Sequence, residues 1–113
     1  HTAKVLKDVN VKYVGDGNRK INTVAICTGA GGRDEELLEY ARLNKIDCIV
    51  GGESKLSIAL AAKDYGIALI DVGHYDSEIL CVKIFAQWLE EYKDLLLESA
   101  SDINPYKSAK EIL

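Results

Sequence analysis

A histidine and a glutamate stand four residues apart in the segment GHYDSE at positions 73–78. Where a helix begins at such a segment, residues with this spacing project from one face. An imidazole and a carboxylate that converge there can hold a divalent metal such as Zn, Mn or Fe. They can also act as a general base and its orienting acid. The pattern therefore makes His74 and Glu78 candidate metal ligands.

The same segment has a purely structural interpretation. Asp76 or Ser77 can be the N-cap of the helix, and Glu78 then lies favourably near the positive helix end. A His-x-x-x-Glu spacing is common by chance, and a catalytic zinc usually takes three ligands from its protein rather than two. Both interpretations stay open on spacing alone.

Glycine-containing loops at positions 28–32, 51–54 and 73–78 each follow a predicted strand. Ligands of an open parallel sheet bind beyond the carboxyl ends of its strands, so these loops share the edge where a site is expected. The first loop can cradle an anion on its backbone N–H groups. It lacks the GxGxxG and GK[ST] patterns, and acidic residues follow it at 34–36. A tight turn that needs a positive φ is therefore the favoured interpretation.

The elements that position these loops alternate along the chain. Asp34 is predicted to cap one helix and Gly66 to end another. Strands are predicted at 9–13, 21–27 (with a buried centre at 24–26), 47–50, 67–72 and 95–97, and helices at 34–43, 54–65 and from Asp76 or Ser77 to 93. The last helix has a periodicity that predicts a wide buried face. This order predicts a single α/β domain over residues 1–113, a three-layer αβα fold with a mostly parallel sheet.

The amino-acid composition excludes some classes of function. The 113 residues carry 14 Lys and Arg against 18 Asp and Glu, a net charge of −4. The acidic balance without a basic run argues against a nucleic-acid partner, and no apolar run approaches the ~20 residues that span a membrane. Cys27, Cys48 and Cys81 have apolar neighbours and no metal-finger spacing. This favours three buried free thiols in a reducing cytoplasm over a reactive Cys27.

The chain begins with His1 and contains no Met, so we expect a fragment of a longer protein or a vector-derived first residue. A fragment that has lost the part it packs against is expected to expose apolar surface and to associate with itself. The first strand and residues 103–113 are candidates for edge pairing or docking in a homo-oligomer.

Three strings carry a resemblance to a known family: TVAICTGAGG at 23–32, IVGGE at 49–53 and IDVGHYDSE at 70–78. Together with Asn104-Pro105-Tyr106, they resemble the C-terminal half of the Nif-three-like family. Members of that family are described as GTP cyclohydrolase 1 type 2 homologues or dinuclear metal centre hexameric proteins. The similarity runs from about Lys12 to Tyr106. It implies that this chain is one lobe of a two-lobe α/β protein that assembles as a toroidal hexamer.

In that family the C-terminal half supplies one His and one Glu to a centre of two divalent ions. By position, these ligands correspond to His74 and Glu78. The resemblance implies that a pair of histidines and an aspartate come from the N-terminal half. Two departures stand out: positions 54–57 (SKLS) contain no His where many relatives have one, and Gly51 replaces a more usual Thr.

The resemblance favours a metal-dependent, hydrolase-like lobe that acts on a nucleotide or a related small molecule in the intact protein. His74 and Glu78 would then ligate the ions, and Glu53 would orient a water or a histidine. The alternative is a non-catalytic metal-binding, oligomerisation or regulatory scaffold, and an isolated lobe with two ligands fits this better than it fits an enzyme. A generic α/β domain whose His74 only caps a helix is a third hypothesis.

Overall fold

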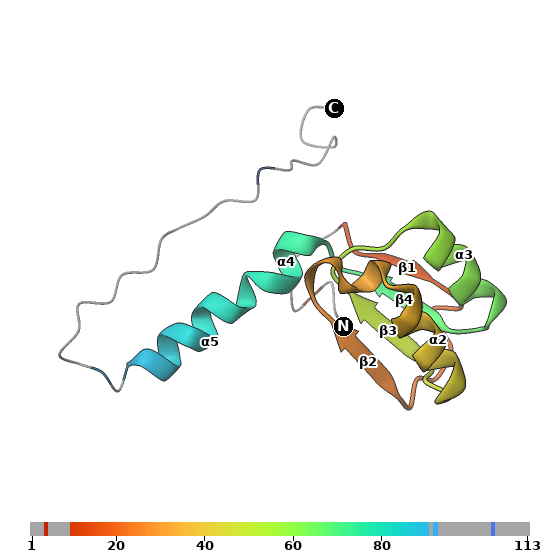
Figure 1. The fold of residues 1–113 in the computed structure, drawn as a ribbon, viewed down its shortest axis with the longest axis horizontal. Coiled ribbons are helices and arrows are strands. Elements are labelled where there is room, and N and C mark those ends of the chain that lie inside the picture. Colours follow the sequence, from red (N-terminus) through yellow and green to blue (C-terminus); the bar gives the residue numbers. More distant parts are fainter. Residues whose placement is uncertain (1–3, 5–9, 91, 93–104, 106–113) are drawn as a thin grey trace.

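The computed structural model describes residues 4, 10–90, 92 and 105 of the chain (Figure 1). Its sheet contains β1 (Lys12–Val14), β2 (Val24–Cys27), β3 (Cys48–Gly51) and β4 (Ala68–Asp71), in the order β1-β4-β3-β2. Strands β2, β3 and β4 pair in parallel, and β1 joins β4 antiparallel at one edge. The predicted α/β class with a mostly parallel sheet is confirmed.

The helical elements are η1 (Gly29–Arg33), α2 (Glu35–Leu43), α3 (Leu56–Asp64), α4 (His74–Glu78) and α5 (Leu80–Leu89). As predicted, Asp34 caps α2, because its side chain accepts a hydrogen bond from the backbone N–H of Glu36 at 2.8 Å. Gly66 lies beyond the end of α3 with φ +67°, also as predicted. Helix α3 begins two residues later than the predicted start at Ser54.

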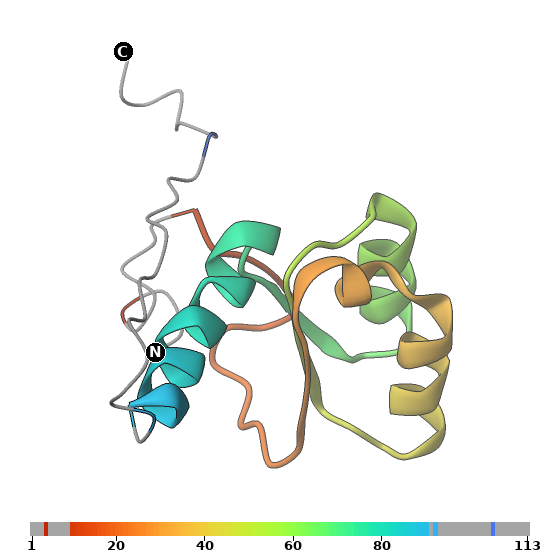
Figure 2. The same ribbon diagram turned by 60° about the vertical axis from the view of Figure 1, so that its left-hand side comes forward.

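The core lies between the sheet and helices α2 and α3, which cover the same face (Figure 2). Its buried side chains are Leu38, Ala41, Ile49, Ile58, Ala62, Ile67 and Leu69. They come from α2, β3, α3 and β4, with Ile67 directly before β4, so short apolar strands and the inner stripes of two helices meet in one cluster. This core fixes the carboxyl ends of the three parallel strands relative to one another.

The opposite face of β2 is open. Val24 and Ile26 point to this face and are 50% and 74% exposed. The prediction of a buried centre at 24–26 is therefore wrong for two of its three residues, because the sequence pattern identifies an apolar strand without showing what covers it.

The predicted long helix is two helices, and it begins earlier than expected. Gly73, with φ +82°, is the N-cap of α4, which begins at His74. Ile79 ends α4 and is the N-cap of α5. The predicted start at Asp76 or Ser77 is wrong because this glycine turn lets the helix begin directly after it. Neither of those residues is the N-cap.

Helix α5 has no buried residue, so the predicted wide buried face is also wrong. Its large apolar side chains include Phe85 and Trp88, which stack edge to face at 5.4 Å between ring centroids and are 53% and 63% exposed. Figures 1 and 2 show α4 and α5 on the side of the sheet away from α2 and α3, with α5 projecting outwards. Periodicity shows which residues share a helix face, but not whether anything packs against it.

Two further sequence predictions can be compared with the structure. The cysteines are free, but only Cys48 is buried, while Cys27 is half-buried and Cys81 on α5 is exposed. No helix in the described part of the chain is both long and apolar enough to cross a membrane. The predicted strand at 95–97 and the docking segment at 103–113 lie outside the described residues, Pro105 excepted.

Asp47 fastens the loop before β2 to the start of β3. Its Oδ2 accepts backbone N–H hydrogen bonds from Asn22 at 2.9 Å and Thr23 at 3.0 Å. Its Oδ1 forms an ion pair with Nη2 of Arg19 at 3.2 Å. These backbone hydrogen bonds, with the charge of Arg19, lower the pKa of the Asp47 carboxyl.

We expect Asp47→Ala to lower the melting temperature at neutral pH. Because folding lowers the pKa of this carboxyl, its contribution is present above the unfolded value of about 3.9 and is lost as pH falls through the folded pKa. Thermal unfolding at neutral and acidic pH checks this, with Asp64→Ala at the end of α3 as the control. A difference between wild type and Asp47→Ala that stays constant down to about pH 2 contradicts the prediction.

Candidate metal site

The loops after β2, β3 and β4 meet at one edge of the sheet, as the parallel pairing requires. The backbone N–H of Gly52 donates to the carbonyl of Cys27 at 3.1 Å, and that of Val72 donates to the carbonyl of Gly51 at 2.9 Å. These bonds extend the strand pairing into the loops. The first turn, η1, contacts both β3 and α4. The three predicted site loops therefore form one continuous structure.

His74 lies between two carboxylates. Its Nδ1 is 3.1 Å from Oε2 of Glu53, and its Nε2 is 3.1 Å from Oε2 of Glu78. Glu53 comes from the loop after β3, whereas His74 and Glu78 stand one turn apart on α4. The structure thus brings together all three residues singled out in the sequence. It also adds Arg33, whose Nη1 lies 3.0 Å from Oε1 of Glu53.

The charges of this chain shift two pKa values in opposite directions. The hydrogen bond with Glu53 raises the pKa of His74, and the negative charge of Glu78 adds to the effect. The same hydrogen bond lowers the pKa of Glu53, with a further contribution from Arg33. The three side chains are between 41% and 50% exposed, so an ion or a small molecule can reach them from solvent.

Asp71, at the end of β4, holds the second and third loops together. Its Oδ2 accepts hydrogen bonds from the backbone N–H of Ser54 at 3.2 Å and from its hydroxyl at 2.7 Å. Its Oδ1 accepts the backbone N–H of Gly73 at 3.0 Å. Glu53 and His74 are the immediate neighbours of these two loop residues. The hydrogen bonds of Asp71 also explain why α3 begins later than predicted, because they hold Ser54 outside the helix.

Ser77 joins the first loop to α4. Its Oγ accepts the backbone N–H of Gly29 at 2.9 Å and donates to the carbonyl of His74 at 2.8 Å. In the same loop, the N–H of Gly31 donates to the carbonyl of Thr28 at 3.2 Å. Two of the N–H groups that an anion would need are thus already used. Gly29 has φ +57°, and this agrees with the favoured interpretation of a tight turn.

The glycines in these loops are required by close approach. A Cβ on Gly29 would lie 2.0 Å from Oε1 of Glu78 and 3.2 Å from Nε2 of His74. A Cβ on Gly52 would lie 2.4 Å from the backbone nitrogen of Gly29. Real Cβ atoms do not approach backbone this closely. The glycine clustering seen in the sequence therefore serves the packing of the loops around His74.

Arg33, Asp71 and Ser77 were not identified as site residues from the sequence. Each acts through a partner in a different loop, and no local spacing reveals such a contact. The only signal was position, because all three lie in or beside the loops after predicted strands.

The side chains fit a divalent ion as part of a site. Nε2 of His74 and a carboxylate oxygen of Glu78 are neighbouring donors of the types that Zn, Mn and Fe accept. Glu53 lies on the other side of the imidazole. The described residues contain no group of three or more His, Cys, Asp or Glu side chains that could hold a metal together. A complete coordination sphere therefore needs ligands from beyond these residues.

Comparison with known proteins identifies the family. The family model Duf34/NIF3 (NGG1p interacting factor 3) matches residues 1–105. The chain belongs to this family. A Clostridium acetobutylicum protein named GTP cyclohydrolase 1 type 2 homolog is 30% identical, over 87% of this chain and 38% of the relative. A Campylobacter jejuni protein of the same name is 35% identical, over 80% of this chain and 35% of the relative.

Solved structures of the family share the fold. A Staphylococcus aureus protein matches with a TM-score of 0.74 and 30% identity, over 94% of this chain and 31% of its own. A Bacillus cereus protein related to NIF3 matches with a TM-score of 0.71 at 21% identity, over 96% of this chain and 31% of its own, and shows the fold alone. The chain thus spans about a third of the length of the relatives that it matches.

Proposed function

We propose that this chain is the lobe that contributes His74 and Glu78 to a divalent-metal centre of hydrolase type, formed with ligands from the rest of a longer protein. The observation that carries the proposal is the pair itself. The two donor atoms lie 3.1 Å apart on one exposed helix turn, at the carboxyl edge of the parallel sheet. A second carboxylate, Glu53, lies 3.1 Å from the opposite ring nitrogen, and a carboxylate in this place is a typical partner of a metal-binding histidine.

When bound, one or two divalent ions would lower the pKa of a bound water, so that this water could attack a phosphate or a ring carbon. Their positive charge would stabilise the negative charge that develops during the attack. The contribution of this chain is binding and orientation. His74 must be neutral to bind a metal, and Glu53 holds its ring. Glu78 adds negative charge on the metal side. Asp71 and Ser77 keep the loops that carry these side chains in place.

The substrate class proposed is a nucleotide or a related small molecule. Support comes from the name GTP cyclohydrolase 1 type 2 homolog that the relatives carry, together with membership of the family. The isolated chain is expected to be inactive, because it supplies only part of the ligand set.

A second candidate is a non-catalytic metal-binding or oligomerisation scaffold. Two observations favour it. The described residues hold no complete metal set, and α5 exposes apolar side chains along its whole length. Exposed apolar surface of this kind marks an interaction site in soluble proteins. Assembly into a homo-oligomer, a hexamer by family resemblance, belongs to either candidate.

A thermal-shift experiment separates the two candidates. The chain is melted with zinc alone, with GTP alone and with both. The enzyme-type proposal expects GTP to raise the melting temperature only when zinc is present. A ligand at 100 times its Kd adds about 2.7 kcal/mol to the free energy of unfolding. Stabilisation by zinc without any effect of GTP favours the scaffold, and the His74→Ala variant controls for zinc bound elsewhere.

A further inference from the structure

The face of the sheet opposite α2 and α3 is apolar, and part of it is open. Ile49 on β3 belongs to the core, so the alternation of side chains along the strand turns Val50 to the opposite face, where it is half-buried. On β2 the same face presents Val24 and Ile26, which are at least half exposed. Parallel sheets normally have both faces covered. The side of this face that β2 forms therefore lacks its cover.

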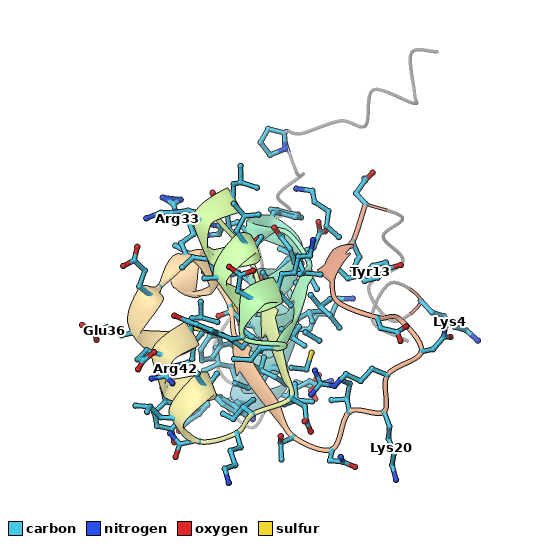
Figure 3. The ribbon with its side chains drawn as sticks, turned by 90° about the vertical axis from the view of Figure 1, so that its right-hand side faces the viewer. Lys4, Tyr13, Lys20, Arg33, Glu36 and Arg42 are labelled. Carbon is cyan, nitrogen blue, oxygen red and sulfur yellow. The ribbon has the colours of Figure 1, made fainter. Side chains whose placement is uncertain are left out.

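Helix α5 is apolar around most of its circumference. Its polar residues are Lys83 and Gln87, which stand one turn apart and form a single stripe. Helix α2, which covers the other face of the sheet, is different: Leu38 and Ala41 are buried in the core, and Glu36 points away from the sheet into solvent (Figure 3). A helix that is apolar nearly all round is normally buried. The described residues thus contain an apolar helix and an apolar sheet face that both lack a covering surface.

The path of the chain brings these two surfaces to the same side of the sheet. The steps β2–α2–β3 and β3–α3–β4 advance from one edge of the sheet towards the other, with both helices on one face. Helices α4 and α5 follow β4 on the opposite face (Figures 1 and 2). Crossovers between parallel strands are right-handed, and on that face the right-handed direction leads from β4 back over β3 and β2. The ten residues of α5 span about 15 Å and the four of β2 about 13 Å, so α5 can cover the whole strand.

Ile79 is a hinge between α4 and α5. It ends α4 and is the N-cap of α5, and its carbonyl accepts the N–H of Val82 at 3.3 Å, a hydrogen bond of the 3₁₀ type. A 3₁₀ turn within a helical stretch often marks a hinge. On the other side of Ile79, the Oγ of Ser77 accepts the N–H of Gly29 and fastens α4 to the first loop. Helix α5 can therefore turn at Ile79 while α4 keeps its place.

We propose that α5 is a strap that turns at Ile79 and packs over the open face of β2. Val24 and Ile26 then lie beneath its apolar side, and Lys83 and Gln87 stay in solvent. The projecting position of α5 in Figure 1 is the open form of this strap. The competing occupant of both surfaces is a second copy of the chain, because exposed apolar patches also mark contacts between molecules. The inference is independent of metal binding.

The fluorescence of Trp88 reports the position of the strap, because this residue lies on α5 and is the only Trp in the chain. In the open form its side chain is 63% exposed. We expect the full chain to show blue-shifted emission and weak quenching by acrylamide, and Ile26→Asp to show red-shifted emission and strong quenching. Ile26→Leu is expected to keep the wild-type signal. Leu56→Asp replaces an equally exposed side chain on α3 and is the matched control that leaves the signal unchanged.

A spin label locates α5 without any change on β2. It is attached to Gln87→Cys, on the polar stripe, in a chain that also carries Cys27→Ser and Cys81→Ser. We expect the label to broaden the methyl signals of Ile26 more than those of Ile58, which lies in the core on the opposite face of the sheet. A mixture of labelled chains with isotope-enriched, unlabelled chains measures contact between two copies, and there we expect no broadening.

The strap is supported if Trp88 is protected in wild type and Leu56→Asp, unprotected in Ile26→Asp, and the label broadens Ile26 within one molecule. If Trp88 is quenched as strongly in wild type as in Ile26→Asp, or if the label leaves Ile26 unaffected, the proposal is overturned. Broadening that appears only in the mixture also overturns it, because a second copy is then the occupant. Where Ile26→Asp does not fold, the label on the unchanged β2 decides alone.

Discussion

Replacing His74 and Glu78 together by alanine is expected to abolish stoichiometric binding of a divalent ion. The two donors lie 3.1 Å apart on one helix turn, and their removal leaves no His, Asp or Glu pair of this kind on α4. The loss should exceed the roughly 10–100-fold that removal of an outer partner costs. Binding should also weaken as pH falls, because the ligand is the neutral imidazole and a proton competes for it.

Metal analysis of the purified chain after dialysis is the measurement, beside the double variant and a Glu39→Ala control on α2. Zinc titration of the same samples gives the affinities. Metal that is stoichiometric in the parent and in Glu39→Ala, but absent from the double variant, supports the proposal. If parent and double variant contain the same amount of metal, this pair is not a metal site in the chain alone. The membership of the family would be unaffected.

Gly52→Ala should be among the most destabilising single substitutions at the site. Its Cβ would lie 2.4 Å from the backbone nitrogen and 2.5 Å from the carbonyl oxygen of Gly29, and 2.4 Å from Oγ of Ser77. Two of these three atoms are backbone, so the first loop as a whole must move. Forced overpacking of this kind costs about 1–3 kcal/mol, and we expect a value at the upper end. The shift would also separate Ser77 from Gly29, which join η1 to α4.

Two other glycines separate this contact from general effects of a methyl group. Gly66 has φ +67° but no neighbour within 4 Å of an added Cβ, so Gly66→Ala tests backbone strain without a clash. At Gly17 the added Cβ meets only the Tyr13 side chain at 3.8 Å. Denaturant unfolding should rank the losses of stability as Gly52, then Gly66, then Gly17, with the last within about 0.5 kcal/mol. A loss at Gly66 equal to that at Gly52 would show that crowding is not the reason for glycine there.

The parts of the fold that could be predicted are those with local causes. Asp34 offers a side-chain acceptor directly before an apolar helical stripe, and α2 begins after it. Gly66 supplies the positive φ at the end of α3. The short apolar runs that became β3 and β4 are bounded by turn residues. In each case the determining residues lie within a few positions of the element.

Predictions that depended on distant partners were less successful. The apolar periodicity after Ile79 indicated a helix, but its burial depends on packing against a distant element. At the site, the proximity of His74 and Glu78 was predicted from their helical spacing and from the family resemblance, and that of Glu53 from its place just after a neighbouring strand. Arg33 and Asp71 were missed because their partners, Glu53 and the Ser54 and Gly73 backbone, come from other loops.

The antiparallel edge strand has a consequence for how the protein is made. Lys12 on β1 pairs with Asp71 on β4, so the first strand of the sheet has its partner in the last one. At roughly 5–20 residues per second, the ribosome completes β1 several seconds before β4 emerges. The three parallel strands and their helices have local crossovers and can form in sequence, whereas β1 must wait. A translational pause once β4 has emerged from the ribosome would therefore let the sheet close before α4 and α5 emerge.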